Sequence, residues 1–116
     1  MRELPEELIE RLSRIVSGEN VTESELRAVD EEAEGLARVL AARVDASERR
    51  LTELSGDSMS SLSDTAGELR RVEALRPALQ ELRRLRIALE VRARELRTEW
   101  LLQQRGAGSP GDARLP

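Results

Sequence analysis

The sequence predicts an all-α fold, with a short N-terminal helix, a long antiparallel helical hairpin or coiled coil, and a disordered C-terminal tail. Leu, Arg, Glu and Ala make up 69 of the 116 residues. Such dominance of strong helix formers is typical of coiled coils and long helices. A seven-residue hydrophobic repeat also runs unbroken from Val72 to Trp100. A helix with this repeat packs one narrow seam against a partner helix.

Residues 1–18 are expected to contain a short amphipathic helix that runs from Pro5 to about Ser17. Pro5 suits the first helical position, and Gly18 suits the position that ends a helix. The apolar face of this helix comprises Leu8, Ile9, Leu12, Ile15 and Val16. Because so short a helix is unstable alone, we expect it to dock on another element.

The hairpin is expected to span residues 22–104, with its first helix over residues 23–54. Thr22 and Glu25 fit a capping box that would open this helix. Gly35 either weakens the helix interior by about 1 kcal/mol relative to Ala or allows a close helix approach. The apolar seam of this helix comprises Leu26, Val29, Ala33, Leu36, Leu40, Val44, Ser47, Leu51 and Leu54.

A Ser-rich loop is expected over residues 55–65, because Ser, Asp and Gly side chains favour turns over helix interiors. The alternative is a single continuous rod through Gly56. Thr65 and Glu68 fit a second capping box, which would open the next helix.

The third helix is expected over residues 66–104. Pro77 lies inside it and should kink the helix or divide it near Arg76. Residues 105–116 are rich in Gly and Pro and are expected to form the disordered tail.

The seam of the third helix is the predicted partner interface. It comprises Val72, Leu75, Leu79, Leu82, Arg86, Leu89, Ala93, Leu96 and Trp100. Further apolar residues lie outside this seam, so the apolar arc is wider than a two-stranded coil needs. These residues are Leu69, Leu85, Ile87, Val91, Leu101 and Leu102. Either the first helix or a separate subunit is expected to cover them.

Charge is distributed unevenly along the chain. Residues 1–35 hold 4 Arg and 11 acidic residues, a net charge of −7, whereas residues 65–116 hold 11 Arg and 7 acidic residues, a net charge of +4. Parallel self-pairing of the third helix would oppose like charges and bury Arg86 against its own copy. Folding back about residue 60 instead brings the acidic and basic segments together. The predicted electrostatic flank comprises Glu25, Asp30, Glu32, Arg83, Arg92 and Arg97.

The composition argues against an enzyme and predicts no metal and no cofactor. The chain contains no Cys and no His, which removes the usual thiol nucleophile, proton shuttle and metal ligand. The acidic run at Asp30, Glu31, Glu32 and Glu34 would spread around a helix rather than form an oxygen cage.

An arginine stripe on the third helix offers a rival function. Arg76, Arg83, Arg86, Arg94 and Arg97 fall on one side of a helical wheel and could track phosphates. However, Glu90 interrupts the stripe and no stacking aromatic residues lie between the arginines. Nucleic acid is therefore the weaker partner class.

The expected function is a non-enzymatic helical protein–protein interaction or scaffold subunit. It would assemble through the coiled-coil seam into an oligomer or a multiprotein complex, with an unlike helical subunit or a second copy as partner. The alternative is a small regulator whose arginine stripe binds nucleic acid or an acidic protein surface. No apolar run of membrane-spanning length and no signal-peptide core are present, so an intracellular, cytoplasmic location is expected.

Overall fold

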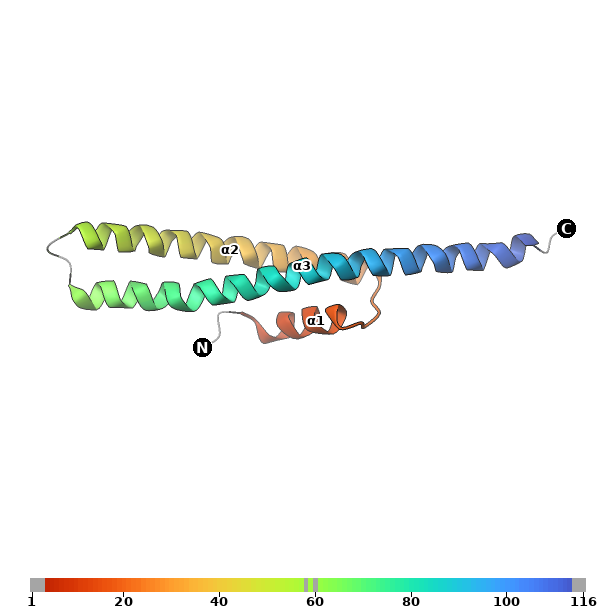
Figure 1. Ribbon diagram of the computed structural model, residues 1–116, viewed down its shortest axis with the longest axis horizontal. Coiled ribbons are helices and arrows are strands. Elements are labelled where there is room, and N and C mark those ends of the chain that lie inside the picture. Colours follow the sequence, from red (N-terminus) through yellow and green to blue (C-terminus); the bar gives the residue numbers. More distant parts are fainter. Residues whose placement is uncertain (1–3, 58, 60, 114–116) are drawn as a thin grey trace.

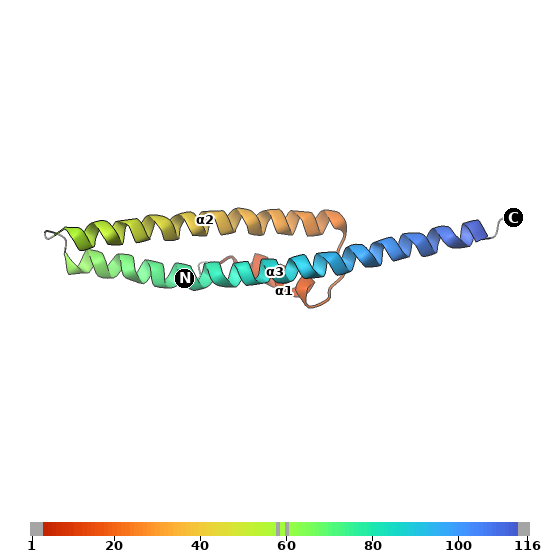
Figure 2. The same ribbon diagram turned by 45° about the horizontal axis from the view of Figure 1, so that its top comes forward.

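Three helices form an elongated hairpin with a short helix along its side. The computed structural model describes residues 4–57, 59 and 61–113, with side chains as far as Arg105. The helices are α1 (Glu6–Val16), α2 (Glu23–Gly56) and α3 (Leu62–Ala113). α2 and α3 lie side by side and antiparallel, and α1 packs mainly against α3 (Figures 1 and 2). The predicted all-α hairpin is confirmed, and the continuous rod is excluded.

A local sequence signal ends α1, whereas Pro5 lies just before the helix and not at the predicted first helical position. Gly18 adopts a φ of +122°, a conformation that favours glycine and ends the helix. The amide of Gly18 donates to the Ile15 carbonyl at 3.2 Å, and the amide of Glu19 donates to the Arg14 carbonyl at 3.0 Å. These two bonds form a Schellman motif. The predicted apolar face is confirmed, since Leu8, Leu12 and Ile15 are buried and Ile9 and Val16 pack partly against the core.

α2 opens with the predicted capping box. The Thr22 hydroxyl accepts from the Glu25 amide at 3.1 Å, and the Glu25 carboxylate accepts from the Thr22 amide at 2.9 Å. The buried residues of α2 are Leu26, Val29, Ala33, Ala37, Leu40 and Ser47. Gly35 faces open space, so no close helix approach occurs there.

The loop between α2 and α3 is shorter than predicted. α2 continues to Gly56 and α3 begins at Leu62, so the Ser-rich loop does not extend over all of 55–65. The Ser61 hydroxyl accepts from the Asp64 amide at 3.0 Å and caps α3. Because Ser61 supplies this cap four residues earlier, Thr65 lies within the first turn. The predicted capping box of Thr65 and Glu68 is therefore corrected to a cap at Ser61.

α3 is a single continuous helix through Pro77, and the predicted division near Arg76 does not occur. The helix changes direction only gently along its length (Figure 1). Pro77 is exposed, so water can reach the backbone carbonyl that proline leaves without a donor. The helical backbone continues to Ala113, beyond the predicted end at residue 104 and into the predicted tail over 105–116. Residues 114–116 of that tail lie outside the described residues.

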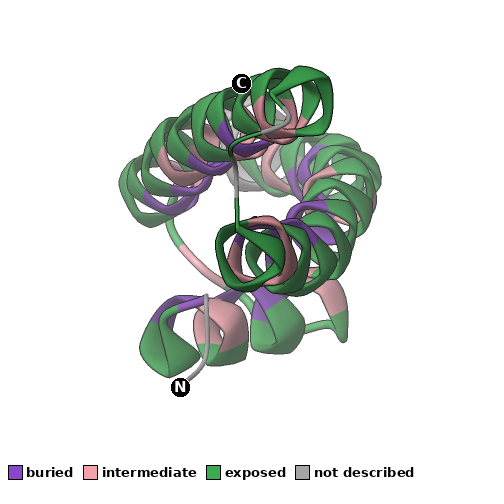
Figure 3. Ribbon diagram, turned by 90° about the vertical axis from the view of Figure 1, so that its left-hand side faces the viewer, coloured by how far each residue is buried: buried purple, intermediate pink, exposed green. Residues whose placement is uncertain are grey.

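The core lies where the three helices meet. Buried residues line the inner sides of the helices in the end-on view (Figure 3). Leu8 and Leu12 of α1, Leu26 and Leu40 of α2, and Leu82 of α3 are almost fully buried. Towards the loop only α2 and α3 face each other, and there Leu51 and Leu54 are half-buried. The fold is thus anchored at the end where α1 covers the hairpin.

Candidate functional site

The predicted partner interface lies between the helices of this chain. Seven of its nine residues are buried: Val72, Leu75, Leu79, Leu82, Leu89, Ala93 and Leu96. Arg86 keeps 28% of its side chain exposed, and Trp100 packs partly against the core. Since α1 and α2 cover this seam, the folded chain does not present it as a free surface.

Ion pairs join the acidic and basic flanks of α2 and α3, as the fold-back predicts. Asp30 lies 3.8 Å from Arg86, Glu23 lies 3.4 Å from Arg97, and Arg76 pairs with Glu48. Exposed pairs of this kind are worth only tenths of a kcal/mol each, but together they select the antiparallel register. Glu23 and Glu48 were not among the predicted flank residues.

Two predicted flank residues of α2 form contacts other than ion pairs with α3. Glu32 pairs with Arg11 of α1 at 2.6 Å rather than with α3. Glu25 belongs to the capping box, and its hydrogen bonds with Thr22 lower the pKa of the carboxyl below its ordinary value. Elsewhere on α2, the hydrogen bond from Arg38 similarly lowers the pKa of Glu34. The acidic residues of α2 therefore form ion pairs with α1, with α3 and with arginines of α2 itself.

Arg92 joins α3 to the C-terminal end of α1, a role that sequence reasoning missed. Its side chain is about 11% exposed. Nε donates to the Ile15 carbonyl at 3.2 Å, and Nη2 donates to the Gly18 carbonyl at 3.0 Å. Glu95 and Glu99 balance the charge at 3.3 and 3.7 Å. A cation at this place also suits the negative end of the α1 dipole.

Glu68 performs a comparable function near the loop. Its side chain is about 8% exposed, and Oε1 accepts from Arg50 of α2 at 3.0 Å and from Arg71 at 3.3 Å. Oε2 is buried without a hydrogen-bond partner among the described residues. Glu68 therefore links the two long helices instead of capping α3.

The wider apolar arc of α3 is covered at only one position. Leu85 of α3 is buried in the core that all three helices share. Five residues remain substantially exposed: Leu69 (48%), Ile87 (64%), Val91 (50%), Leu101 (65%) and Leu102 (58%). The folded chain therefore covers one residue of the arc and leaves five exposed. Coverage of these five residues by a separate subunit stays a prediction.

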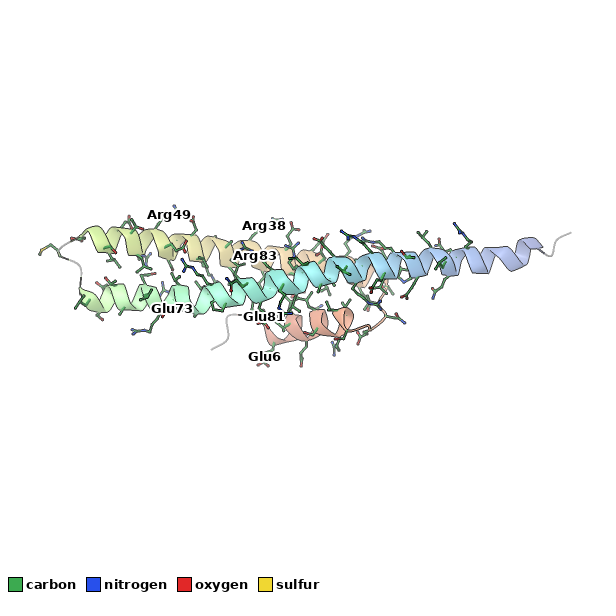
Figure 4. The ribbon with its side chains drawn as sticks, viewed as in Figure 1. Glu6, Arg38, Arg49, Glu73, Glu81 and Arg83 are labelled. Atoms are coloured by element: carbon green, nitrogen blue, oxygen red, sulfur yellow. The ribbon has the colours of Figure 1, made fainter. Side chains whose placement is uncertain are left out.

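The arginine stripe divides into paired and unpaired members. Arg76, Arg86 and Arg97 form ion pairs with α2, whereas Arg83 and Arg94 form none among the described residues. Figure 4 labels Arg83 on α3. Arg49, labelled on α2 in the same view, pairs along its own helix with Asp45 at 2.5 Å. The stripe is thus not a continuous free surface that could track a phosphate backbone.

The hollows of the surface are open grooves rather than enclosed sites. One groove of about 270 Å³ lies between α2 and α3 near Leu26, Leu89 and Arg94. Within the described residues, no group of three acidic side chains is arranged to hold a metal ion. No described helix is long and apolar enough to cross a membrane.

Comparison with known proteins does not place the chain in a family. No protein family, no curated protein and no solved structure is found to match the chain.

Proposed function

We propose that this chain is a non-enzymatic interaction subunit, a helical hairpin that presents part of α3 to another protein in an oligomer or a multiprotein complex. The observation that supports this proposal is the exposed stretch of α3 that follows Trp100. Side chains 101–105 are all exposed beyond Trp100, and they include Leu101 and Leu102. Contiguous apolar residues left uncovered on a helix are typical of a surface that another protein buries.

The hairpin gives this end a fixed direction. α1 and α2 hold the preceding part of α3 through the buried seam, and Arg92 fastens α1 to it. A partner therefore meets a helix that is already folded and oriented, which reduces the entropy lost on binding. In this proposal the Val72–Trp100 seam holds α3 in place within the hairpin, and exposed residues of α3 form the binding surface.

The arginine-stripe alternative, a small regulator of nucleic acid or of an acidic protein, has narrower support. It draws on the two arginines of the stripe that form no ion pair among the described residues, Arg83 and Arg94. Its weakness is that Arg76, Arg86 and Arg97 are engaged with α2.

Site-specific crosslinking tests the proposed function. A photoreactive phenylalanine analogue replaces Leu102 in the chain expressed in its own cell, and the same analogue at Arg43 of α2 is the control. We expect a protein adduct at position 102 and none above background at position 43. An adduct of twice the 13.0 kDa chain mass would identify a second copy as the partner. Equal crosslinking at both positions would contradict the proposal.

A further inference from the structure

A row of exposed residues at seven-residue spacing runs along the outward face of α3, and three of its seven members are apolar. It follows the same alternating steps of three and four as the inner seam, offset to the opposite side of the helix. We call this set the outer seam: Arg84, Ile87, Val91, Arg94, Thr98, Leu101 and Arg105. All seven residues are exposed. The repeat spans 21 helical steps, about 32 Å, which is long enough to carry a partner helix of similar length.

The apolar residues of the outer seam are poorly suited to solvent. Ile87, Val91 and Leu101 are 64%, 50% and 65% exposed, and Leu102 beside them is 58% exposed. Alternation at steps of three and four is the spacing that places such residues against one facing helix. A duplex backbone would not bury them, because phosphates contact cations and leave aliphatic side chains uncovered.

The charged residues of the outer seam lack partners. Arg84, Arg94 and Arg105, together with the adjacent Arg83, form no ion pair among the described residues. The arginines that face α2 or α1, in contrast, are paired with carboxylates or carbonyls. The outer seam therefore combines uncovered aliphatic side chains with arginines that form no ion pair among the described residues.

We propose that the outer seam docks an acidic amphipathic helix of an unlike protein. This inference rests on the proposed function and names the chemistry of its partner. Pairing with the outer seam of a second copy would bring arginine against arginine. The acidic helices of a second copy could offer charge, but their apolar faces are already buried against their own α3. A partner with free apolar residues and acidic flanks satisfies both features of the seam.

Binding of two matched synthetic helices tests this assignment. Both are about 21 residues long with Leu at the a and d positions; one carries Glu at e and g and the other carries Lys. We expect the full chain to bind the Glu helix at least about ten-fold more tightly than the Lys helix, with affinity falling as salt is added. Fluorescence anisotropy of the labelled helix gives both affinities.

Substitutions then locate the binding surface. Val91→Asp and Arg94→Glu should each weaken binding of the Glu helix by about ten-fold or more. Val39→Asp and Arg43→Glu on α2 are matched controls, because Val39 is 46% exposed and Arg43 is also unpaired among the described residues. These controls should leave the affinity within about two-fold. Circular dichroism of each variant verifies that the hairpin remains folded.

Three results would overturn the inference. They are equal affinity for the Glu and Lys helices, unchanged affinity in the Val91 and Arg94 variants, and tighter binding to duplex DNA than to the Glu helix. Crosslinking at Leu102 keeps the two proposals separable. If Leu102 crosslinks to a protein and the Glu helix does not bind, the interaction function stands and the acidic partner is wrong.

Discussion

At the scale of single residues, the most informative contacts are those that join α1 to the hairpin. Arg92 is charged and nearly buried; it donates to the Gly18 carbonyl and adds a second donor to the Ile15 carbonyl, which already accepts from the Gly18 amide. A guanidinium suits this place because its planar fork can reach both carbonyls while keeping its charge paired with Glu95 and Glu99. One side chain thus holds the C-terminal end of α1 against α3.

Replacing Arg92 tests this role. We expect Arg92→Gln to lower the free energy of unfolding by about 2–3 kcal/mol, because the charge-assisted hydrogen bonds to the Ile15 and Gly18 carbonyls are lost. Arg92→Lys should lose less, since it keeps the charge but not the fork. Urea denaturation measures both changes. Arg43→Gln, on an exposed and unpaired side chain, should stay within about 0.5 kcal/mol.

The capping box at Thr22 predicts a dependence of stability on pH. Hydrogen bonds from Thr22 lower the pKa of Glu25, so the ionised carboxyl favours the folded state. This contribution is present above the unfolded pKa of about 4.3 and is lost as pH falls through the lower folded value. Glu25→Gln removes the titrating group and keeps an acceptor. Its free energy of unfolding should therefore fall less steeply on acidification than that of the wild type.

Acid titrations monitored by urea denaturation check this expectation. Glu31→Gln is the matched control, because Glu31 is an exposed glutamate of α2 without a polar partner among the described residues. An acid dependence that is the same in the Glu25 variant as in the wild type would count against the capping box as its source.

At the scale of elements, local signals predicted more than distant contacts did. The helix stop at Gly18 and the capping box at Thr22 each depend on hydrogen bonds between residues a few positions apart, and the sequence predicted both. The start of α3 was misplaced because Ser61 and Thr65 are competing caps in one segment. The role of Arg92 could not be predicted, since its acceptor Ile15 is 77 residues away. Periodicity predicted the seam, but it could not tell which outward residues α1 would cover.

Gly18, which follows α1, and Gly35 of α2 give a paired prediction. A Cβ added at Gly35 meets nothing within 4 Å, so Gly35→Ala should raise the free energy of unfolding by about 0.5–1 kcal/mol. Gly18→Ala should lower it by about 1 kcal/mol or more, because a φ of +122° strains an L-residue. Thermal or urea denaturation distinguishes the two signs. A loss of stability in Gly35→Ala would indicate a tertiary role for that position.

At the scale of the whole molecule, the chain is elongated rather than compact. Its radius of gyration is 21.9 Å and its longest extent is 86 Å, whereas a compact domain of about 100 residues has a radius near 13 Å. Much of each long helix consequently remains at the surface, and only the end covered by α1 has three helices around one core. Such a shape suits a protein that works by offering helix surface to others.

Small-angle X-ray scattering tests the hairpin directly. Extrapolated to low concentration, the chain should have a radius of gyration near the 21.9 Å of the structure. A continuous rod through Gly56 would be about 140 Å long at 1.5 Å per residue, with a much larger radius. Light scattering on the same samples measures the molar mass, so that association is not mistaken for an open rod.

The fastening of α1 by Arg92 also sets an order of events during synthesis. α1 leaves the ribosome before α3, but Arg92, which donates to the Ile15 carbonyl of α1, and most of the residues that α1 contacts belong to α3. The hairpin can close locally as soon as α3 emerges, whereas α1 must wait for a contact that spans most of the chain. The nascent protein therefore carries an uncovered amphipathic segment, and that segment is covered only after α3 has been made.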